Sequence, residues 1–347
     1  MTTQIVPGLR LRPFAGEPDL AGIARIENLE AEADGVPERT DVDGLASRFG
    51  HPNDHFDAGR DVTVAEVEGT PVGVAMREWV TTTDGLREYR HNGAVDPAWR
   101  RRGIGTALLA ENQRLLTEHA TANPTSSPSV LGSWTGDTQH GGVALLGAAG
   151  YHQVRWFFDM LRPSLEDLPE VAMPEGLVLR PITLDTAKAV WLASIEAFRD
   201  HWGGFDGSDE QLQRWLAAPS TDLSLWAVAF DGDEVAGGVV NVIDKAENEA
   251  LGLRRGWLAS VFTRRPWRRR GVAQALIAES FRRFRDRGMT SAGLGVDAAN
   301  AQGALGLYER LGFEVEYRST AWRKPLDIPA PAGRDEGSAP GTAGPNR

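Results

Sequence analysis

The chain has 347 residues, of which 41% are hydrophobic and 24% charged, with no cysteine and a formal net charge of −11. At roughly 150 residues per domain, this length predicts about two globular domains. The absence of cysteine excludes disulfides, thiolate metal sites and a cysteine nucleophile, and no His or carboxylate spacing predicts another metal site. The acidic balance argues against nucleic acid as a partner. Without a long apolar run or a signal-peptide pattern, we expect no membrane partner and a cytoplasmic location.

Two segments recur along the chain and predict a duplicated domain. The segment Gly8–Phe14 returns as Gly176–Ile182. The segment Trp99–Gly105 returns as Trp267–Ala273, and both repeats lie 168 residues further on. Such a period is too long for a solenoid, so each copy is expected to be a domain of its own.

The composition between and after the copies predicts the domain boundaries. We expect domains at residues 1–162 and 176–326, joined by a linker at residues 163–175 that is rich in proline and acidic residues. Residues 327–347 are rich in Pro, Gly and Ala and are expected to form a disordered tail.

Hydrophobic periodicity predicts alternating strands and helices in each copy. In the second copy the expected elements are, in chain order, a strand at Leu177–Arg180, a helix at Leu184–Phe198, a hairpin of Leu223–Phe230 and Glu234–Val242, a strand at Trp257–Thr263, a helix at Val272–Asp286, a strand at Ala292–Val296, a helix at Ala301–Leu311, and closing strands at Phe313–Tyr317 and Thr320–Arg323. The first copy repeats this order, although Ser126–His140 has the composition of a remodelled loop. The predicted fold class is α/β, with two tandem domains, each a mixed, mostly antiparallel sheet flanked by helices.

The most specific motif is an arginine-rich turn between a strand and a helix. Strand Trp257–Thr263 leads into Arg264–Arg270, and Gly271 follows directly before the helix. The unpaired amides and the dipole at a helix N-terminus bind anions, and small residues let a phosphate approach the backbone. We therefore predict a pyrophosphate site; the alternative is a set of arginines that only solvate a surface helix. A dinucleotide fingerprint and a Walker loop are excluded, because neither pattern occurs.

These residues resemble the GNAT superfamily of acetyl-CoA-dependent N-acetyltransferases. Its pattern is a strand ending in Val-x-Pro, then Arg-x-x-Gly-x-Gly/Ala, then an Asn followed by Leu-Tyr-Glu-x-Leu-Gly-Phe. Val95–Arg100 matches the beginning of this pattern in the first copy. Asn300 and Leu307–Phe313 match its end in the second copy. The resemblance implies two tandem GNAT-type domains.

The resemblance also implies roles for particular residues. Val261 and Thr263 would pair with pantetheine and the acetyl carbonyl on a strand that splays from its neighbour, and Asn300 would contact the pantetheine arm. Tyr308 would protonate the departing CoA thiolate; the alternative is a core tyrosine. The pyrophosphate of acetyl-CoA would be held by Arg268, Arg269, Arg270, Gly271, Val272 and Ala273. The corresponding first-copy residues are Val95, Arg100, Arg101, Arg102, Gly103, Ile104 and Gly105.

The two copies differ at the position of the predicted acid. Aligning Gly150 with Gly312 places Leu146 opposite Tyr308. Leucine cannot donate a proton, so we expect the second copy to be catalytic and the first to be degenerate.

On the acceptor side, Glu196, Asp200 and Trp202 combine acids with an aromatic ring, which suits a cationic amine; the alternative is a packed helix end. The predicted reaction is direct acetyl transfer to a primary amine of a small molecule. The tandem layout also resembles mycothiol synthases, which acetylate a cysteinyl amine, but Trp257 stands where that family has an acidic residue. A non-catalytic acetyl-CoA sensor and a protein or peptide N-acetyltransferase are also compatible with these residues. The sequence leaves the oligomeric state open.

Overall fold

The computed structural model describes residues 6–37, 39–199, 201–202, 208–218, 220–299 and 303–328. We call the part up to Arg162 the first half and the part from Gly176 onward the second half. The first half contains β1 (Leu9–Pro13), α1 (Glu17–Asp34), α2 (Val42–Phe49), α3 (Ala58–Asp61), β2 (Val62–Val67), β3 (Thr70–Thr81), β4 (Arg87–Val95), η1 (Pro97–Trp99), α4 (Ile104–Ala122), β5 (Ser129–Gly136), α5 (His140–Ala148) and β6 (His152–Arg162).

The second half repeats this order with its own variations. It contains β7 (Val178–Leu179), α6 (Leu184–Phe198), α7 (Asp209–Ala217), η2 (Leu223–Leu225), β8 (Ala227–Asp231), β9 (Glu234–Val242), α8 (Lys245–Leu251), β10 (Arg255–Thr263), η3 (Arg265–Trp267), α9 (Val272–Asp286), β11 (Ser291–Asp297), α10 (Ala304–Arg310) and β12 (Glu314–Pro325).

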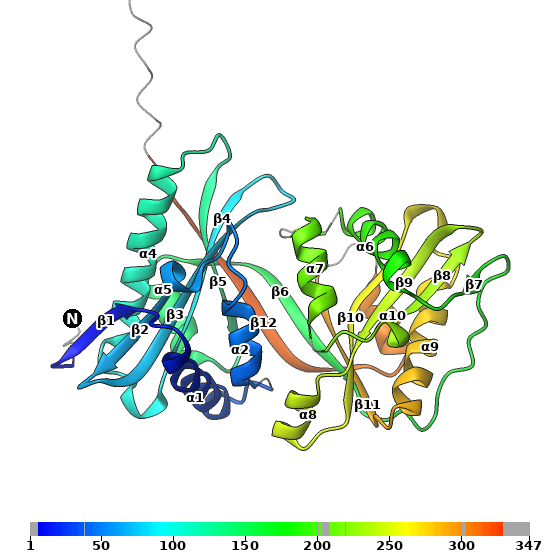
Figure 1. Ribbon diagram of the computed structural model, residues 1–347, viewed down its shortest axis with the longest axis horizontal. Helices are drawn as coiled ribbons and strands as arrows, with labels where there is room; N and C mark the ends of the chain where they lie inside the picture. Colours follow the sequence, from blue (N-terminus) through cyan, green and yellow to red (C-terminus); the bar gives the residue numbers. More distant parts are fainter. Residues whose placement is uncertain are drawn as a thin grey trace, which may run out of the picture.

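The two halves share one sheet because their last strands cross. The strand order is β1-β2-β3-β4-β5-β12-β6-β11-β10-β9-β8-β7. Strand β12 pairs with β5 of the first half, and β6 pairs with β11 of the second half. In Figure 1, β6 and β12 run side by side through the centre and join the two halves. The mixed, mostly antiparallel sheet flanked by helices confirms the predicted fold class.

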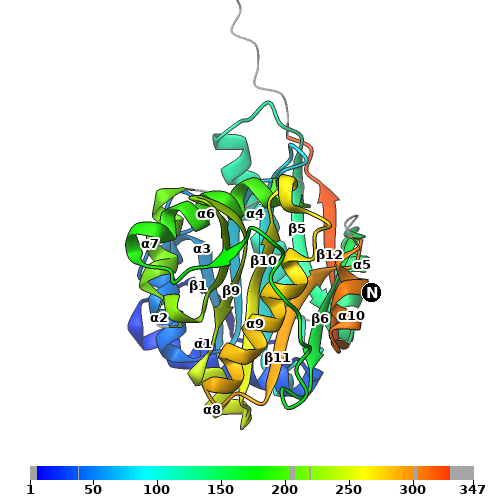
Figure 2. The same cartoon turned by 90° about the vertical axis from the view of Figure 1, so that its right-hand side faces the viewer.

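Each half buries its part of the sheet between two helical layers. In the second half, the hydrophobic cluster under α9 and α10 includes Leu276, Phe281 and Tyr308. The opposite face packs against α6 through a cluster that includes Val190 and Trp226. Figure 2 looks onto this half and shows α9 lying along the strands.

Two predicted segments are wrong in detail. The closing strands expected at Phe313–Tyr317 and Thr320–Arg323 form one strand, β12, with register irregularities instead of a turn. The segment Ser126–His140, expected to be a loop, contains β5, because its backbone pairs with β4 on one side and β12 on the other. At one position of this strand only a small residue fits, because a Cβ at Gly132 would approach the Glu88 side chain to 2.9 Å.

The segment predicted as a linker carries no helix or strand between Pro163 and Glu175. It nevertheless packs against the second half, because Leu165 is buried in the core cluster under α9 and its amide donates to Thr290 O at 3.0 Å. The domain boundaries themselves stay a prediction, and the predicted tail lies outside the described residues from residue 329 onward.

Candidate active site

The arginine-rich turn has the same backbone in both halves. Arg101 and Arg269 adopt positive φ values of 63° and 61°, and Gly103 and Gly271 follow at 82° and 84°. Neither α4 nor α9 has a side-chain hydrogen bond at its N-cap. The first amides of both helices are therefore unoccupied by a capping side chain, which is the arrangement that binds anions.

In the second half, the strand before this turn separates from its neighbour. Strand β10 pairs with β11 only through Arg255, Gly256 and Trp257, although β10 continues to Thr263. On its other side, β10 stays paired with β9, with a shift of register between Leu258 and Ser260. The predicted splay is thus present, and it opens toward the turn.

The splay leaves backbone donors of β10 without a strand partner. Arg264 N donates to Ala236 O of β9 at 3.0 Å. Since successive amides of a strand point in opposite directions, the amides of Thr263 and Val261 point away from β9 and into the opening. These are the two residues predicted to contact pantetheine and the acetyl group.

Tyr308 lies on α10, which follows β11, the other wall of the opening. Its side chain is 7% exposed and packs against Phe313 with 6.0 Å between ring centroids. Its hydroxyl has no hydrogen-bond partner in the described part of the chain. Burial raises the pKa of Tyr308 to about 12, so the hydroxyl keeps its proton at neutral pH.

The corresponding position in the first half is Leu146, as the alignment predicts. Tyr151 N donates to Leu146 O at 3.1 Å, and Phe313 N donates to Tyr308 O at 3.0 Å, so the two helix ends have matching backbone contacts. The nearby Tyr151 hydroxyl lies 2.7 Å from His91 Nε2 and is buried. The first half therefore has no phenol exposed at this position.

In the first half, carboxylates of helix α1 contact the first arginine of the turn and the strand that precedes it. Arg100 donates to both oxygens of Asp34 at 2.7 Å and to Glu30 at 3.3 Å. Glu30 also accepts from the amide of Val95 at 3.3 Å, the position that Thr263 has in the second half. Burial raises the pKa of Glu30 to about 7 despite the nearby arginine. Carboxylate oxygens thus lie where an anionic ligand would bind.

The second-half turn is open by comparison. Arg268, the counterpart of Arg100, donates only to the carbonyls of Thr263 at 3.0 Å and Ala197 at 3.1 Å, and it pairs with no acidic side chain among the described residues. Gly271 is exposed, and a Cβ there would meet no atom within 4 Å, whereas Gly103 is buried. Arg269 and Arg270 are exposed. Among the described residues, no carboxylate pairs with Arg268, whereas Arg264 at the start of the turn pairs with Glu196 and Glu234.

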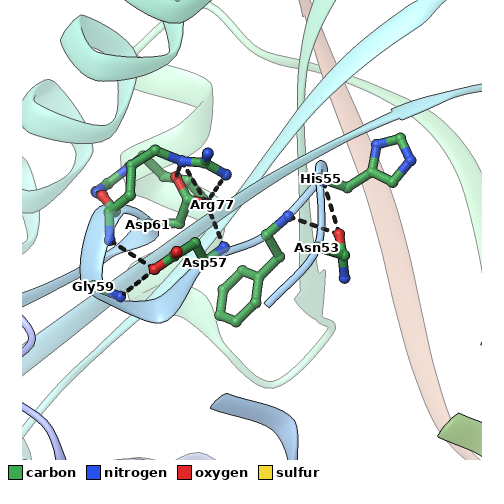
Figure 3. Close-up of polar contacts among 8 residues, drawn as sticks. Asn53, His55, Asp57, Gly59, Asp61 and Arg77 are labelled. Atoms are coloured by element: carbon green, nitrogen blue, oxygen red, sulfur yellow. Dashed lines mark hydrogen bonds and ion pairs between the residues drawn. The ribbon is translucent and has the colours of Figure 1, made fainter. Parts of the chain in front are cut away.

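The first half also contains two cavities, of about 310 and 390 Å³, that share Arg77 and Glu78 in their walls. Arg77 is 3% exposed and donates to Thr63, Asn112 and Arg60 O. Figure 3 shows it reaching from β3 toward the loop that carries Asp57 and Asp61. Burial lowers the pKa of Arg77. In the second half, Asn241 stands in the place of Arg77 and Ser280 in the place of Asn112. There the buried Asn241 amide donates to the Ser280 hydroxyl at 2.9 Å, so this contact is neutral.

Two of the residues predicted on the acceptor side, Glu196 and Trp202, each contact an arginine of the chain. The Glu196 carboxylate pairs with Arg264 at 2.9 Å, and the Trp202 ring carries the guanidinium of Arg323 at 4.4 Å from its centroid. Both already contact cations of the chain, so their role toward a substrate amine stays a prediction. Asp200 and Asn300 lie outside the described residues.

The sequence did not predict the contacts of Glu30 and Asp34 with Arg100. The acidic composition of α1 is visible in the sequence, but the contact joins residues 66 and 70 positions apart. In the described part of the chain, no group of three or more His, Asp or Glu side chains is arranged to hold a metal. No helix there is both long and apolar enough to cross a membrane.

Comparison with known proteins places this geometry in a family. Residues 191–313 match the acetyltransferase (GNAT) family, and residues 58–129 match an acetyltransferase (GNAT) domain. A mycothiol acetyltransferase from Clavibacter michiganensis is 30% identical over 327 residues, covering 87% of this chain and 96% of the relative. The chain belongs to the GNAT acetyltransferases. A mycothiol acetyltransferase from Salinispora tropica is 29% identical over 316 residues, covering 86% and 95% of the two chains.

Solved structures of GNAT proteins share the tandem architecture. A GCN5-related N-acetyltransferase from Sphaerobacter thermophilus has a TM-score of 0.71 and 25% identity, covering 93% of this chain and 97% of its own. A tandem GNAT protein from the clavulanic acid biosynthesis pathway has a TM-score of 0.68 at 16% identity, covering 93% and 100% of the two chains. GNAT acetyltransferases use acetyl-CoA as the acetyl donor, so the open turn of this acetyltransferase is its candidate donor site.

Proposed function

We propose that the second half of this acetyltransferase moves an acetyl group from acetyl-CoA directly to a primary amine of a small molecule. The observation that carries this proposal is the open turn at Arg268 and Gly271, which continues into the unpaired amides of Val261 and Thr263. The equivalent path in the first half is filled by Glu30 and Asp34. In the described part of the chain, no carboxylate contacts Arg268 or the amides of Val261 and Thr263, which supports placing an extended anionic ligand in the second half.

Each part of this line has a chemical task. The amides of Val272 and Ala273, with the charge of Arg268, hold the pyrophosphate of acetyl-CoA. The outward amides of Val261 and Thr263 donate to the pantetheine arm and to the acetyl carbonyl. As the amine attacks, negative charge develops on that carbonyl oxygen, and amides fixed in a strand stabilise it without having to reorganise.

Tyr308 completes the reaction as the general acid. Collapse of the tetrahedral intermediate breaks the carbon–sulfur bond, and the departing thiolate takes the proton of the Tyr308 hydroxyl. The hydroxyl is protonated at neutral pH because burial raises its pKa to about 12. Asn300 stays a predicted contact of the pantetheine arm. Because the chain has no cysteine, transfer cannot proceed through an acyl-cysteine intermediate.

The test is an acceptor screen that measures release of free CoA thiol, followed by initial-rate kinetics. Direct transfer predicts intersecting double-reciprocal lines. Parallel lines together with an acetylated enzyme trapped before the acceptor is added would show a covalent route and overturn the proposal. A screen in which no primary amine stimulates thiol release would overturn the assignment of the acceptor.

A cysteinyl amine is a second candidate acceptor, favoured by the similarity to mycothiol acetyltransferases over most of the chain. Because such an acceptor has a thiol of its own, its acetylation is measured by mass spectrometry of the product. Acetylation of the cysteinyl compound at a higher kcat/KM than other amines supports this candidate. The reverse order excludes it.

A further inference from the structure

The larger of the two cavities in the first half lies where β4 leaves β5. Strand β4 continues to Val95 but pairs with β5 only as far as Arg90. The cavity of about 390 Å³ is lined there by residues of both strands, of β3 and of the helices α1 and α2. Arg48 and Asn92 are exposed, so solvent reaches the cavity on their side. Its lining includes Glu27, Arg48, Met76, Glu78, Asn92 and Trp134.

Two carboxylates line this cavity without a cationic partner in the described part of the chain. Because side chains alternate along a strand, Glu78 of β3 faces α1 and α2 together with Met76, while Arg77 between them faces α4. The Glu78 carboxylate has no hydrogen bond or ion pair among the described residues. Glu27 of α1 accepts there only from the hydroxyl of Thr40, at 2.8 Å. Both carboxylates can therefore accept hydrogen bonds from an ammonium group.

The arginine across the strand pair from Glu78 has other partners. Arg90 lies opposite Glu78 in the register of β3 and β4. Its Nε donates to Glu88 at 2.8 Å, and its guanidinium lies over the Trp134 ring at 5.0 Å from the centroid. At the equivalent place of β9 the second half has Val242, an apolar residue. The carboxylate of Glu78 is therefore not part of the framework that the two halves share.

A guanidinium on α2 provides a positive charge near Glu27. Arg48 lies over the Phe56 ring at 5.6 Å from the centroid, and it pairs with no carboxylate of the described residues. Burial raises the pKa of Glu27, and the Thr40 hydroxyl and the charge of Arg48 counteract this rise. A carboxylate and a guanidinium that lie near each other without a bond between them can bind the two opposite charges of one small molecule.

We propose that this cavity is a non-catalytic binding site for an α-amino acid. The ammonium group binds to Glu27 and Glu78, and the α-carboxylate binds to Arg48. The side chain of the amino acid lies toward Met76 and the ring of Trp134. A ligand with both charges satisfies all three ionic side chains, whereas a simple amine leaves Arg48 without a partner and a simple acid leaves both carboxylates without one.

The first half lacks the groups that the proposed acetyl transfer needs. Leu146 stands at the position of Tyr308, and Glu30 already accepts from the amide of Val95. An amino acid bound in this cavity is therefore held and not acetylated. The site goes beyond the proposed function and does not rest on it, because binding requires no acetyl-CoA.

The experiment measures binding of matched probes to the full chain by calorimetry, without acetyl-CoA. L-Alanine and L-phenylalanine carry both charges. Ethylamine and phenethylamine lack the carboxylate, and lactate and phenyllactate lack the ammonium group. We expect at least one of the amino acids to bind with a Kd of about 1 mM or tighter, and its two analogues to bind about 10- to 100-fold more weakly. Binding of neither amino acid overturns the proposal, and so does an amine that binds as tightly as its amino acid.

Variants of the lining residues locate the site. Glu27→Gln can still accept the bond from Thr40, and Glu78→Gln loses no contact with the described residues. Each should weaken binding of the amino acid about 10- to 100-fold. Glu32→Gln, a matched change at an exposed residue of the same helix as Glu27, should bind like the wild type. Arg48→Gln should bind the amino acid no more tightly than the corresponding amine. Thermal melting checks that each variant is folded.

A further variant separates this site from the acceptor side of the second half. If Glu196→Gln abolishes binding of the amino acid while Glu27→Gln and Glu78→Gln retain it, the ligand binds in the second half and the proposal is wrong. If no amine stimulates thiol release but the amino acid binds as expected, the proposed function fails and the first-half site stands.

Discussion

In the second half, Arg268 donates to two backbone carbonyls and to no carboxylate of the described chain, whereas in the first half Arg100 pairs with Asp34 and Glu30. The backbone around the two arginines is the same, down to the positive φ of the next residue. A turn therefore keeps its shape while the side chains around it decide whether it is open to an anion. The sequence motif therefore predicts the backbone conformation of the turn. Whether its arginine is free to contact a ligand depends on the side chains of the neighbouring helix.

The same contrast appears where helix α1 or α6 meets the end of the strand. Arg25 pairs with Asp96 at 2.8 Å in the first half, and Glu196 pairs with Arg264 at 2.9 Å in the second half. The two ion pairs have opposite polarity at equivalent places. The residue after the strand is thus an acid, Asp96, in the first half and an arginine, Arg264, in the second, and each is paired with a helix residue of opposite charge.

The largest expected effect concerns the acid that only the second half has. Tyr308→Phe should lower kcat about 10²- to 10⁴-fold, while acetyl-CoA affinity stays within twofold because the ring still packs. Leu146→Ala should cost about 2–5 kcal/mol of unfolding free energy through lost core packing, with no direct effect on the chemical step. Thiol-release kinetics at a temperature where both variants are folded by circular dichroism measure the difference. Full turnover of Tyr308→Phe would place the active site elsewhere.

The buried carboxylate of the first half predicts a pH-dependent stability. Burial raises the pKa of Glu30 from 4.5 to about 7, so folding favours its protonated form. That stabilisation is fully present below the ordinary pKa and is lost as the pH rises through about 7. Relative to Glu30→Gln, the wild type should therefore lose about 3 kcal/mol between about pH 4 and pH 8. Urea titrations across this range measure it. A difference that does not vary with pH would contradict the burial of Glu30.

The two turn arginines should differ in their effect on the donor. Arg268→Ala removes a charge that pairs with no carboxylate of the described residues and should weaken acetyl-CoA binding about 10- to 100-fold. Arg100→Ala removes a charge that Asp34 already balances and should change the affinity less than twofold. Isothermal calorimetry compares the two variants with the wild type. Equal losses would show that both turns bind the donor.

The stoichiometry of binding gives the smallest but most direct signal. We expect the wild type to bind one acetyl-CoA per chain. In the first half, Glu30 already accepts from the Val95 amide and Asp34 already pairs with Arg100. Calorimetry with excess ligand measures the number of sites. Two equivalents, with the second abolished by a bulky residue at Gly103 and the first by one at Gly271, would contradict the contrast between the halves.

Local patterns predicted much of the second half. The periodicity of apolar residues gave helices at Leu184–Phe198 and Val272–Asp286 and a strand at Glu234–Val242, each with the bounds that the structure shows. The positions of Tyr308 and Leu146 in equivalent helix ends followed from the alignment of the copies. These features depend on residues close together in sequence, so a pattern reports them.

Features that depend on distant partners were not predictable in this way. The alternation of β12 is the same whichever strand it pairs with, so the sequence could not show that it crosses into the first half. The contact of Glu30 with the Val95 amide depends on how a helix packs against β4. The bond from Trp257 to Glu247 likewise depends on how a helix packs against β10. In addition, Ser126–His140 has the composition of a loop although it lies mid-sheet.

The crossing of β6 and β12 sets an order of events during synthesis. Strand β5 pairs with β12, which is synthesised much later. Trp322 of β12, for example, donates to Thr135 of β5 and lies 187 positions further along the chain. At about 5–20 residues per second, the ribosome needs roughly 10–40 seconds to make that stretch. During this interval β5 is an edge strand with unpaired backbone groups, open to pairing with another nascent chain. The pairing of β5 is therefore complete only after β12, a strand of the second half, has been translated.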